Sequence, residues 1–106
     1  QNKFIFMNPR RVVVTGMGII SPLGNSIFDF WDNLKKGENG ISKILSFDTS
    51  NLQVHIAGQS NIKLEQYLDS KTLNKIDRFT AFAIIAANQA LEISKINTKK
   101  IHTSKV

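Results

Sequence analysis

The 106-residue chain contains no cysteine. This absence removes disulfides, thiolate metal sites and thiol nucleophiles from these residues, and it says nothing about the cellular compartment. There is also no run of 18 apolar residues, so the sequence predicts no transmembrane helix. With 42% hydrophobic and 21% charged residues, the composition is that of an ordinary globular protein, and the length suits one small domain.

Acidic residues are few, with 8 against 14 lysines and arginines, so the net charge is +6. Nucleic acid could explain a basic balance, but no zinc-ligand pattern, recognition helix or aromatic-basic stacking pattern accompanies it. We therefore expect no nucleic acid partner. An acidic protein partner is the better functional interpretation. Solvated surface lysines, or a genome rich in A and T, are the alternatives without function.

The chain is organised around residues 10–24, which read R-R-V-V-V-T-G-M-G-I-I-S-P-L-G. The β-branched run Val12–Val14 predicts a strand covered on both faces, as in a parallel α/β sheet. Gly16 and Gly18 then let the backbone turn or pass close to another group. A second break follows at Pro22, since the residue before a proline is pushed out of the α region.

A strand followed by G-x-G also suggests a dinucleotide-binding turn. However, Ser21 occupies the third glycine position, and Pro22 stands where the phosphate-binding helix should begin. The ribose-binding acid expected about 20 residues further on could only be Glu38, in a turn-like stretch. A structural strand with a tight turn fits every residue and is the preferred interpretation.

One amphipathic helix is predicted over residues 27–36, with Asn25 and Ser26 as N-cap candidates and Gly37 after its end. Its apolar residues recur at i, i+3, i+4 and i+7, one face of a helix: Ile27, Phe30, Trp31 and Leu34. On this face we expect Trp31 to be a core residue and not a ligand-binding one.

Residues 37–50 are predicted to be mostly loop, with Phe47 as an apolar anchor before a side-chain-capped turn. Val54–Gly58 alternates apolar and polar residues, which predicts a strand with one wet face. His55 falls on the polar phase of that strand. No second histidine or acid stands at ligand spacing, so we expect a solvent-facing residue without a catalytic or metal role.

The last third of the chain is predominantly helical in pattern. Residues 64–68 predict one helical turn, Asp69 and Ser70 are caps, and a helical pattern over 71–95 has a break near Ile76–Asp77. The helical pattern after this break has a broad apolar face: Phe79, Phe82, Ala83, Ala86, Ala87, Ala90 and Leu91. A helix apolar on most sides is usually buried. It needs more partners than 106 residues readily supply, so we expect part of a larger domain.

The opening motif R-R-V-V-V-T-G-M-G-I-I-S-P-L-G resembles the amino terminus of the elongating β-ketoacyl-acyl-carrier-protein synthases, most of all that of synthase II. Further matches follow in order: Trp31, Gly37, Gly40–Ile41, Phe47–Asp48, Ala57–Gly58, Asp77–Phe79 and Ala90–Leu91. The resemblance covers roughly the first quarter of such an enzyme. It implies an α/β protein, the N-terminal part of a thiolase-like layered α/β/α/β/α fold, incomplete in this chain. Residues 10–106 would be the truncated synthase domain and residues 1–9 a leader or linker remnant. Val106 would begin the next strand.

The resemblance also implies an activity for the whole protein, the decarboxylative Claisen condensation of an acyl chain with malonyl-acyl carrier protein. Such acyltransferases need no metal or organic cofactor. Their catalytic cysteine, histidines and lysine lie beyond the region covered, and His55 and His102 match none of them. No catalytic, cofactor-binding or metal-binding residue is therefore assigned, and the 106 residues alone are expected to be inactive.

Acyl carrier protein, loaded with acyl or malonyl groups, is the partner that the resemblance implies. In related synthases, basic residues before the D-R-F-like motif dock this acidic protein, and Lys71 and Lys75 stand at matching positions. Four residues apart, they are expected to share one helical face. Ser70 and Asn74 occupy two further positions that are often basic, so the patch would be weaker than usual. Two solvated surface lysines remain the alternative.

Two other functions stay open at this point. One is the ketosynthase domain of a polyketide synthase, and the other is a small basic binding module without catalysis. The family resemblance implies a homodimer for the full-length enzyme. A plastid-type organelle and the cytoplasm both fit the sequence, and chain-length preference is not encoded in these residues.

Overall fold

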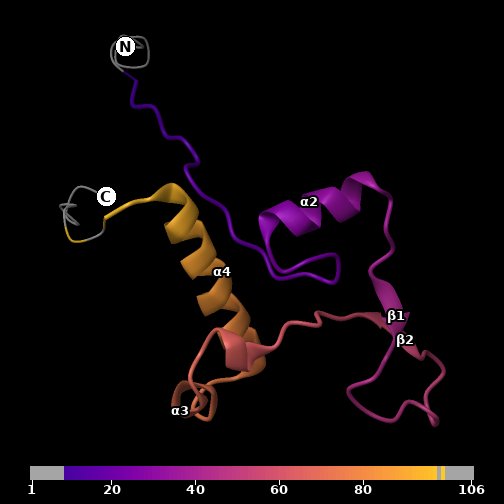
Figure 1. The fold of residues 1–106 in the computed structure, drawn as a ribbon. Coiled ribbons are helices and arrows are strands. Elements are labelled where there is room, and N and C mark those ends of the chain that lie inside the picture. The colour runs from indigo at the N-terminus through magenta and orange to yellow at the C-terminus, as the bar shows by residue number, and fades with distance from the viewer. Residues whose placement is uncertain (1–8, 98, 100–106) are drawn as a thin grey trace, which may run out of the picture.

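The structure, a computed structural model, describes residues 9–97 and 99 (Figure 1). The expectations for residues 1–8, and for most of the basic tail up to Val106, lie outside the described residues. The elements in chain order are α2 (Ile27–Lys35), β1 (Ile41–Lys43), β2 (Ile56–Gly58), the 3-10 turn η1 (Leu64–Gln66), α3 (Ser70–Leu73) and α4 (Arg78–Ser94). None of the helices in this part of the chain is both long and apolar enough to cross a membrane.

Local signals place α2 where the sequence predicts a helix. The Ser26 side chain accepts a hydrogen bond from the Asp29 N–H at 3.2 Å, which satisfies one of the free donors of the first turn. Lys35 pairs with Asp32 at 3.8 Å across one turn. The chain leaves the helix through Gly37, whose φ of +73° glycine adopts without strain. The helix ends one residue earlier than predicted.

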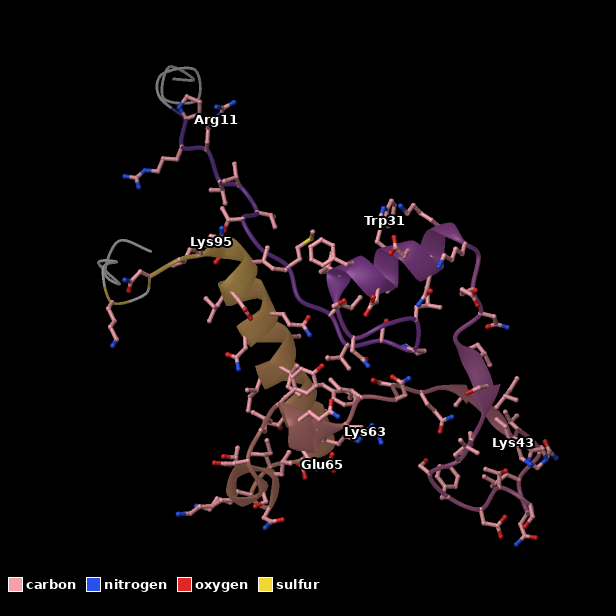
Figure 2. All side chains as sticks on the ribbon, viewed as in Figure 1. Arg11, Trp31, Lys43, Lys63, Glu65 and Lys95 are labelled. Carbon is pink, nitrogen blue, oxygen red and sulfur yellow. The ribbon has the colours of Figure 1, made fainter. Side chains whose placement is uncertain are left out.

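The expectation that Trp31, on the apolar face of α2, is a core residue is wrong for the described structure. Trp31 is 54% exposed, and its ring points away from the rest of the chain (Figure 2). The ammonium group of Lys35 lies over the ring, 5.8 Å from its centroid. On the same face Ile27 and Phe30 are half-buried, whereas Leu34 is exposed like Trp31, so the second half of the face has no cover among the described residues.

The two strands form an antiparallel hairpin with Ile41 opposite Gly58 and Lys43 opposite Ile56. The β1 strand lies in a stretch predicted to be loop, because three residues are too few for a detectable alternation. The β2 strand begins two residues later than Val54, where the prediction placed it. His55 is exposed as predicted, and its backbone carbonyl accepts a hydrogen bond from the Ile44 N–H at 2.8 Å.

The hairpin loop contains the predicted capped turn. The Asp48 carboxylate accepts a hydrogen bond from the Ser50 N–H at 3.0 Å, and this bond lowers the pKa of the Asp48 carboxyl. Thr49 is buried and its hydroxyl lies 3.0 Å from Nδ1 of His55. Phe47, by contrast, is 58% exposed, so the expectation that it anchors the loop is wrong.

The helical region from residue 64 onward follows the sequence closely. Asp69 caps α3 by accepting the Thr72 N–H at 2.8 Å. The helix stops at Leu73, and α4 starts at Arg78, so the predicted break near residues 76–77 is confirmed. The α4 helix ends at Ser94, and its C-cap residue Lys95 has a left-handed φ of 57°.

The core is small. The buried apolar side chains are Ile62, Ala81 and Ile85, and Phe79 at the start of α4 is 72% exposed. The radius of gyration is 19.4 Å, whereas a compact domain of 100 residues has about 13 Å. Much of the apolar face predicted for α4 therefore has no cover among the described residues.

Val12–Val14 does not form the predicted strand in this structure. The segment is extended, but no described strand pairs with it, and its side chains are 71–94% exposed. A strand is defined by its hydrogen-bonded neighbours, which a sequence run cannot supply by itself. The prediction of a strand covered on both faces is therefore wrong for the part of the chain described.

Candidate functional site

The G-x-G of the opening motif contacts α4 and does not form a turn. A Cβ atom on Gly16 would collide with the carbonyl oxygen of Ala90 and lie 2.8 Å from the backbone nitrogen of Ser94. A Cβ atom on Gly18 would collide with the carbonyl oxygen of Ala86. Glycine is needed here because two backbones approach closely. The space that a bound phosphate would need is filled by α4, which argues against the dinucleotide interpretation.

The tight turn predicted in this motif lies further along the chain. Neither Gly16 nor Gly18 has a positive φ, and the chain reverses instead between Ser21 and Gly24. The Ser21 N–H donates to the Gly24 carbonyl at 3.0 Å, and the Ser21 hydroxyl accepts the Leu23 N–H at 3.2 Å. Pro22 sits inside this turn, where its fixed φ is favourable.

Gln89 of α4 is a structural residue that the sequence reasoning missed. Its Oε1 accepts the Ile19 N–H at 3.0 Å, and its Nε2 donates to the Asn25 carbonyl at 2.6 Å. One side chain thereby satisfies two backbone groups and ties the opening segment to α4. The available signal is a pair of amides between alanines, A-A-N-Q-A-L, on a helix that is otherwise mostly apolar.

Asn25 extends this connection to the segment before η1. Its Oδ1 accepts the Ser60 hydroxyl at 2.9 Å, and its Nδ2 donates to Oδ1 of Asn61 at 2.9 Å. Arg78 donates from Nη2 to the Ser60 carbonyl at 3.3 Å. These bonds link the opening segment, the chain after β2 and the start of α4. They therefore help to fix the position of residues 63–78, which contain the two predicted docking lysines.

The two predicted docking residues lie together between η1 and α4. Lys71 is in α3 and is exposed, and Lys75 is exposed beyond the end of α3. The Lys75 N–H donates to the Thr72 carbonyl at 3.0 Å, three residues back. The sequence predicts that both lysines share one helical face, but α3 ends at Leu73, so Lys75 lies outside the helix. They share one short helical turn and the bend that follows it.

The charge around these lysines is mixed. Residues 63–78 contain four cations, Lys63, Lys71, Lys75 and Arg78, and three acids, Glu65, Asp69 and Asp77. Figure 2 shows Lys63 and Glu65 near the base of α4. The hydroxyl and the N–H of Thr72 both hydrogen-bond to the Asp69 carboxylate and lower its pKa, so this acid is ionised at neutral pH. Among the described residues there is one ion pair, between Lys35 and Asp32. Neither Lys71 nor Lys75 therefore has a carboxylate partner within this part of the chain.

No catalytic constellation is present in the described part of the chain. It contains no group of three or more histidines, cysteines, aspartates or glutamates placed to hold a metal ion. His55 contacts Thr49 and no acid, as expected of a surface residue. His102 lies outside the described residues.

Comparison with solved structures gives the class of the fold. The chain superposes on a structure described as the ishigamide ketosynthase/chain length factor with a TM-score of 0.79 and 25% identity, over 89% of this chain and 24% of that one. A second structure contains a type II polyketide-synthase acyl carrier protein in complex with its ketosynthase bound to the hexaketide. It matches with a TM-score of 0.64 and 28% identity, over 90% of this chain and 21% of that one. The fold is therefore that of the ketosynthases, an incomplete thiolase-like α/β domain.

Sequence comparison identifies the family. The profile of the Beta-ketoacyl synthase, N-terminal domain, matches residues 9–106, and the chain belongs to this family. The 3-oxoacyl-[acyl-carrier-protein] synthase 2 of Staphylococcus aureus (strain COL) is 44% identical over 89 residues, which are 83% of this chain and 22% of the relative. The Synechocystis protein of the same name is 36% identical over 101 residues, 94% of this chain and 24% of the relative. The chain thus spans less than a quarter of the length of these relatives.

Proposed function

We propose that this chain is the N-terminal part of an enzyme that elongates fatty acyl chains on acyl carrier protein. The observation that carries the proposal is the 44% identity over 89 residues to a 3-oxoacyl-[acyl-carrier-protein] synthase 2. The reaction is a decarboxylative Claisen condensation. A cysteine of the enzyme holds the acyl chain as a thioester, malonyl-carrier protein loses CO2, and the resulting carbanion attacks the thioester carbonyl and releases the cysteine thiolate. The nucleophile must come from outside these 106 residues, because they contain no cysteine.

A ketosynthase of polyketide synthesis is the second candidate, supported by the two structural neighbours. Their identities of 25% and 28% are lower than the 44% and 36% of the synthases of fatty-acid type. This difference favours fatty acyl elongation. A basic binding module without catalysis is the weakest candidate, because the chain belongs to a family of condensing enzymes.

The product formed by the complete protein separates these candidates. It should be incubated with acyl- and malonyl-carrier protein, without reductase, and the carrier-bound products read by mass spectrometry. Fatty acyl elongation predicts one 3-oxoacyl product, two carbons longer than the acyl primer. Repeated extension without reduction would favour the polyketide alternative, and no condensation would contradict the proposal. The isolated 106 residues should give no product above a blank without protein.

We further propose that Lys71 and Lys75 belong to the surface that docks the carrier protein. The support is their match to docking positions of related synthases, their exposure, and the lack of carboxylate partners within the described segments. Exposed charges are each worth little, roughly 0.2–1 kcal/mol. Several acting together mainly raise the association rate and its salt sensitivity.

The docking proposal is tested by changing both lysines to glutamate in the complete protein. The apparent KM for carrier-protein substrates should rise roughly ten-fold, since each reversal replaces an attraction by a repulsion. Turnover of a short acyl-coenzyme A analogue should stay nearly unchanged. Lys36→Glu with Lys43→Glu is the charge-matched control, because β1 and the end of α2 lie far from α3 (Figure 1). Equal losses with both substrates would indicate a folding role, and no loss would indicate solvated lysines.

For the complete protein we also propose a homodimer, on the strength of the family resemblance. Light scattering coupled to size exclusion measures the molar mass directly. A monomer at micromolar concentration would contradict this assignment without affecting the condensation chemistry.

A further inference from the structure

Arg78 differs from the lysines of the candidate docking surface because its side chain is held in place. Nη2 donates to the Ser60 carbonyl at 3.3 Å, and the guanidinium carbon lies 4.8 Å from the centroid of the Phe82 ring. Hydrogen bonding and stacking on an aromatic face together restrict a side chain that otherwise loses about 2 kcal/mol of rotamer entropy on ordering. A partner that binds this guanidinium therefore loses less free energy to ordering the arginine side chain.

The guanidinium retains capacity for a ligand. Arginine carries five N–H donors, and the hydrogen bond to Ser60 occupies only one nitrogen. Asp77 is its neighbour in sequence and stands at the N-cap position of α4 without a side-chain capping hydrogen bond, and it makes no ion pair with Arg78 in the described structure. Arg78 is exposed, so these free donors can reach a group from outside the molecule.

A surface hollow lies beside this side chain. It is lined by Ser46, Gly58, Gln59, Ser60, Arg78 and Phe82. The hollow combines one cation, side chains that can donate hydrogen bonds and one aromatic face, and the described residues place no acid in its wall. This combination suits a carboxylate on a short aliphatic stem, since the fork of an arginine matches the two oxygens of a carboxylate.

We propose that Arg78 and this hollow receive an acidic side chain of the carrier protein, as a fixed anchor beside the more diffuse charge of Lys71 and Lys75. The inference rests on the proposed function, because it takes its partner from there. Arg78 stands three residues after Lys75 in the chain, so one acidic surface can reach both. The lysines would speed the encounter, and Arg78 would slow dissociation.

A double-mutant cycle in the complete protein tests the contact. Arg78→Gln should raise the dissociation constant for acyl carrier protein about ten-fold, mostly through a faster dissociation rate. Arg78→Lys should recover only part of the loss, because lysine keeps the charge and loses the fork. At least one Glu→Gln or Asp→Asn substitution in the carrier protein should weaken binding to the wild-type protein and have little effect on binding to Arg78→Gln. Such non-additivity is expected of two residues that contact each other. Lys36→Gln, at the end of α2 and outside the lining of the hollow, is the control and should change neither rate.

The outcomes separate this inference from the proposed function. If the wild-type protein binds carrier protein and the Lys71, Lys75 variant binds weakly, but no carrier-protein acid couples to Arg78, the anchor is overturned and the function stands. Arg78→Gln could instead lower the melting temperature and reduce turnover of the acyl-coenzyme A analogue as much as turnover of carrier-protein substrates. In that case Arg78 serves only to hold Ser60, and the anchor is again overturned. If the wild-type protein neither condenses nor binds carrier protein, both proposals fail.

Discussion

At the scale of single residues, the structure gives physical reasons for positions that a motif only marks. Gly18 stands opposite the carbonyl of Ala86, where the opening segment and α4 approach more closely than any side chain permits. Gln89 fills a different need, since its amide is both donor and acceptor and satisfies two backbone groups of different segments. These residues hold the opening segment, and the resemblance to condensing enzymes rests largely on that segment.

Gly18→Ala should destabilise the complete protein, because the added methyl group meets backbone and not a flexible side chain. Overpacking of this kind costs roughly 1–3 kcal/mol. Urea unfolding of the two proteins measures the change. Gly37→Ala is an informative comparison, since it meets no atom within 4 Å and suffers only from its φ of +73°. An unchanged unfolding midpoint for Gly18→Ala would contradict the close approach.

Gln89→Leu should leave the Ile19 N–H and the Asn25 carbonyl without their partners while keeping the side-chain volume similar. Each part-buried group that loses its hydrogen bond costs roughly 1–3 kcal/mol. The expected result is a lower free energy of unfolding and faster amide exchange at Ile19. Asn88→Ala, one residue away on an exposed position of α4, should have little effect. Equal effects of the two substitutions would show that Gln89 forms no bridge.

At the scale of elements, the features that could be predicted from the sequence are those that neighbouring residues determine, such as helix caps and helix breaks. Ser26 and Asp69 cap their helices as expected, and the break before α4 falls where the sequence indicates it. The strand at Val12–Val14, the burial of Trp31 and the anchoring of Phe47 were predicted and are not observed. Each of these three requires a partner element distant in sequence, and side-chain type alone does not say whether one is present. Lys71 and Lys75 could be singled out only by resemblance, because exposed lysines have no distinctive pattern.

The cap of α3 makes a prediction about titration. The hydroxyl and N–H of Thr72 hydrogen-bond to the ionised Asp69 carboxylate, so the pKa of this carboxyl lies below its ordinary value of 3.8. A depressed pKa means that the cap contributes to stability above pH 3.8, and that this contribution is lost as the pH falls through the folded-state pKa. NMR titration of the side-chain carboxyl measures it. Thr72→Ala removes the hydroxyl and keeps the backbone N–H, so the pKa should move part of the way back toward the ordinary value. An unchanged titration would contradict the contribution of the hydroxyl.

At the scale of the whole molecule, the described chain has the surface of one part of a larger assembly. Apolar side chains are exposed on the opening segment, on α2, on the β1–β2 hairpin and on α4. The solved ketosynthases that it resembles are more than four times longer than the stretch that matches, since it covers 24% and 21% of them. We therefore expect the local elements to be intrinsic to the sequence and their stable packing to depend on further polypeptide.

The 106 residues expressed alone should accordingly be loosely packed or should aggregate. Among the described residues the buried apolar ones are Ile62, Ala81 and Ile85, and such a core cannot offset the conformational entropy of ordering the chain. Small-angle scattering should give a radius of gyration near 19.4 Å or larger, well above the roughly 13 Å of a compact domain of this length. The dye ANS should bind to the exposed apolar surface, and heating should produce no cooperative transition. The complete protein is the control and should bind little dye. A compact radius with dispersed amide resonances and a sharp melt would mean that these residues fold as an independent domain, with a packing different from the one described.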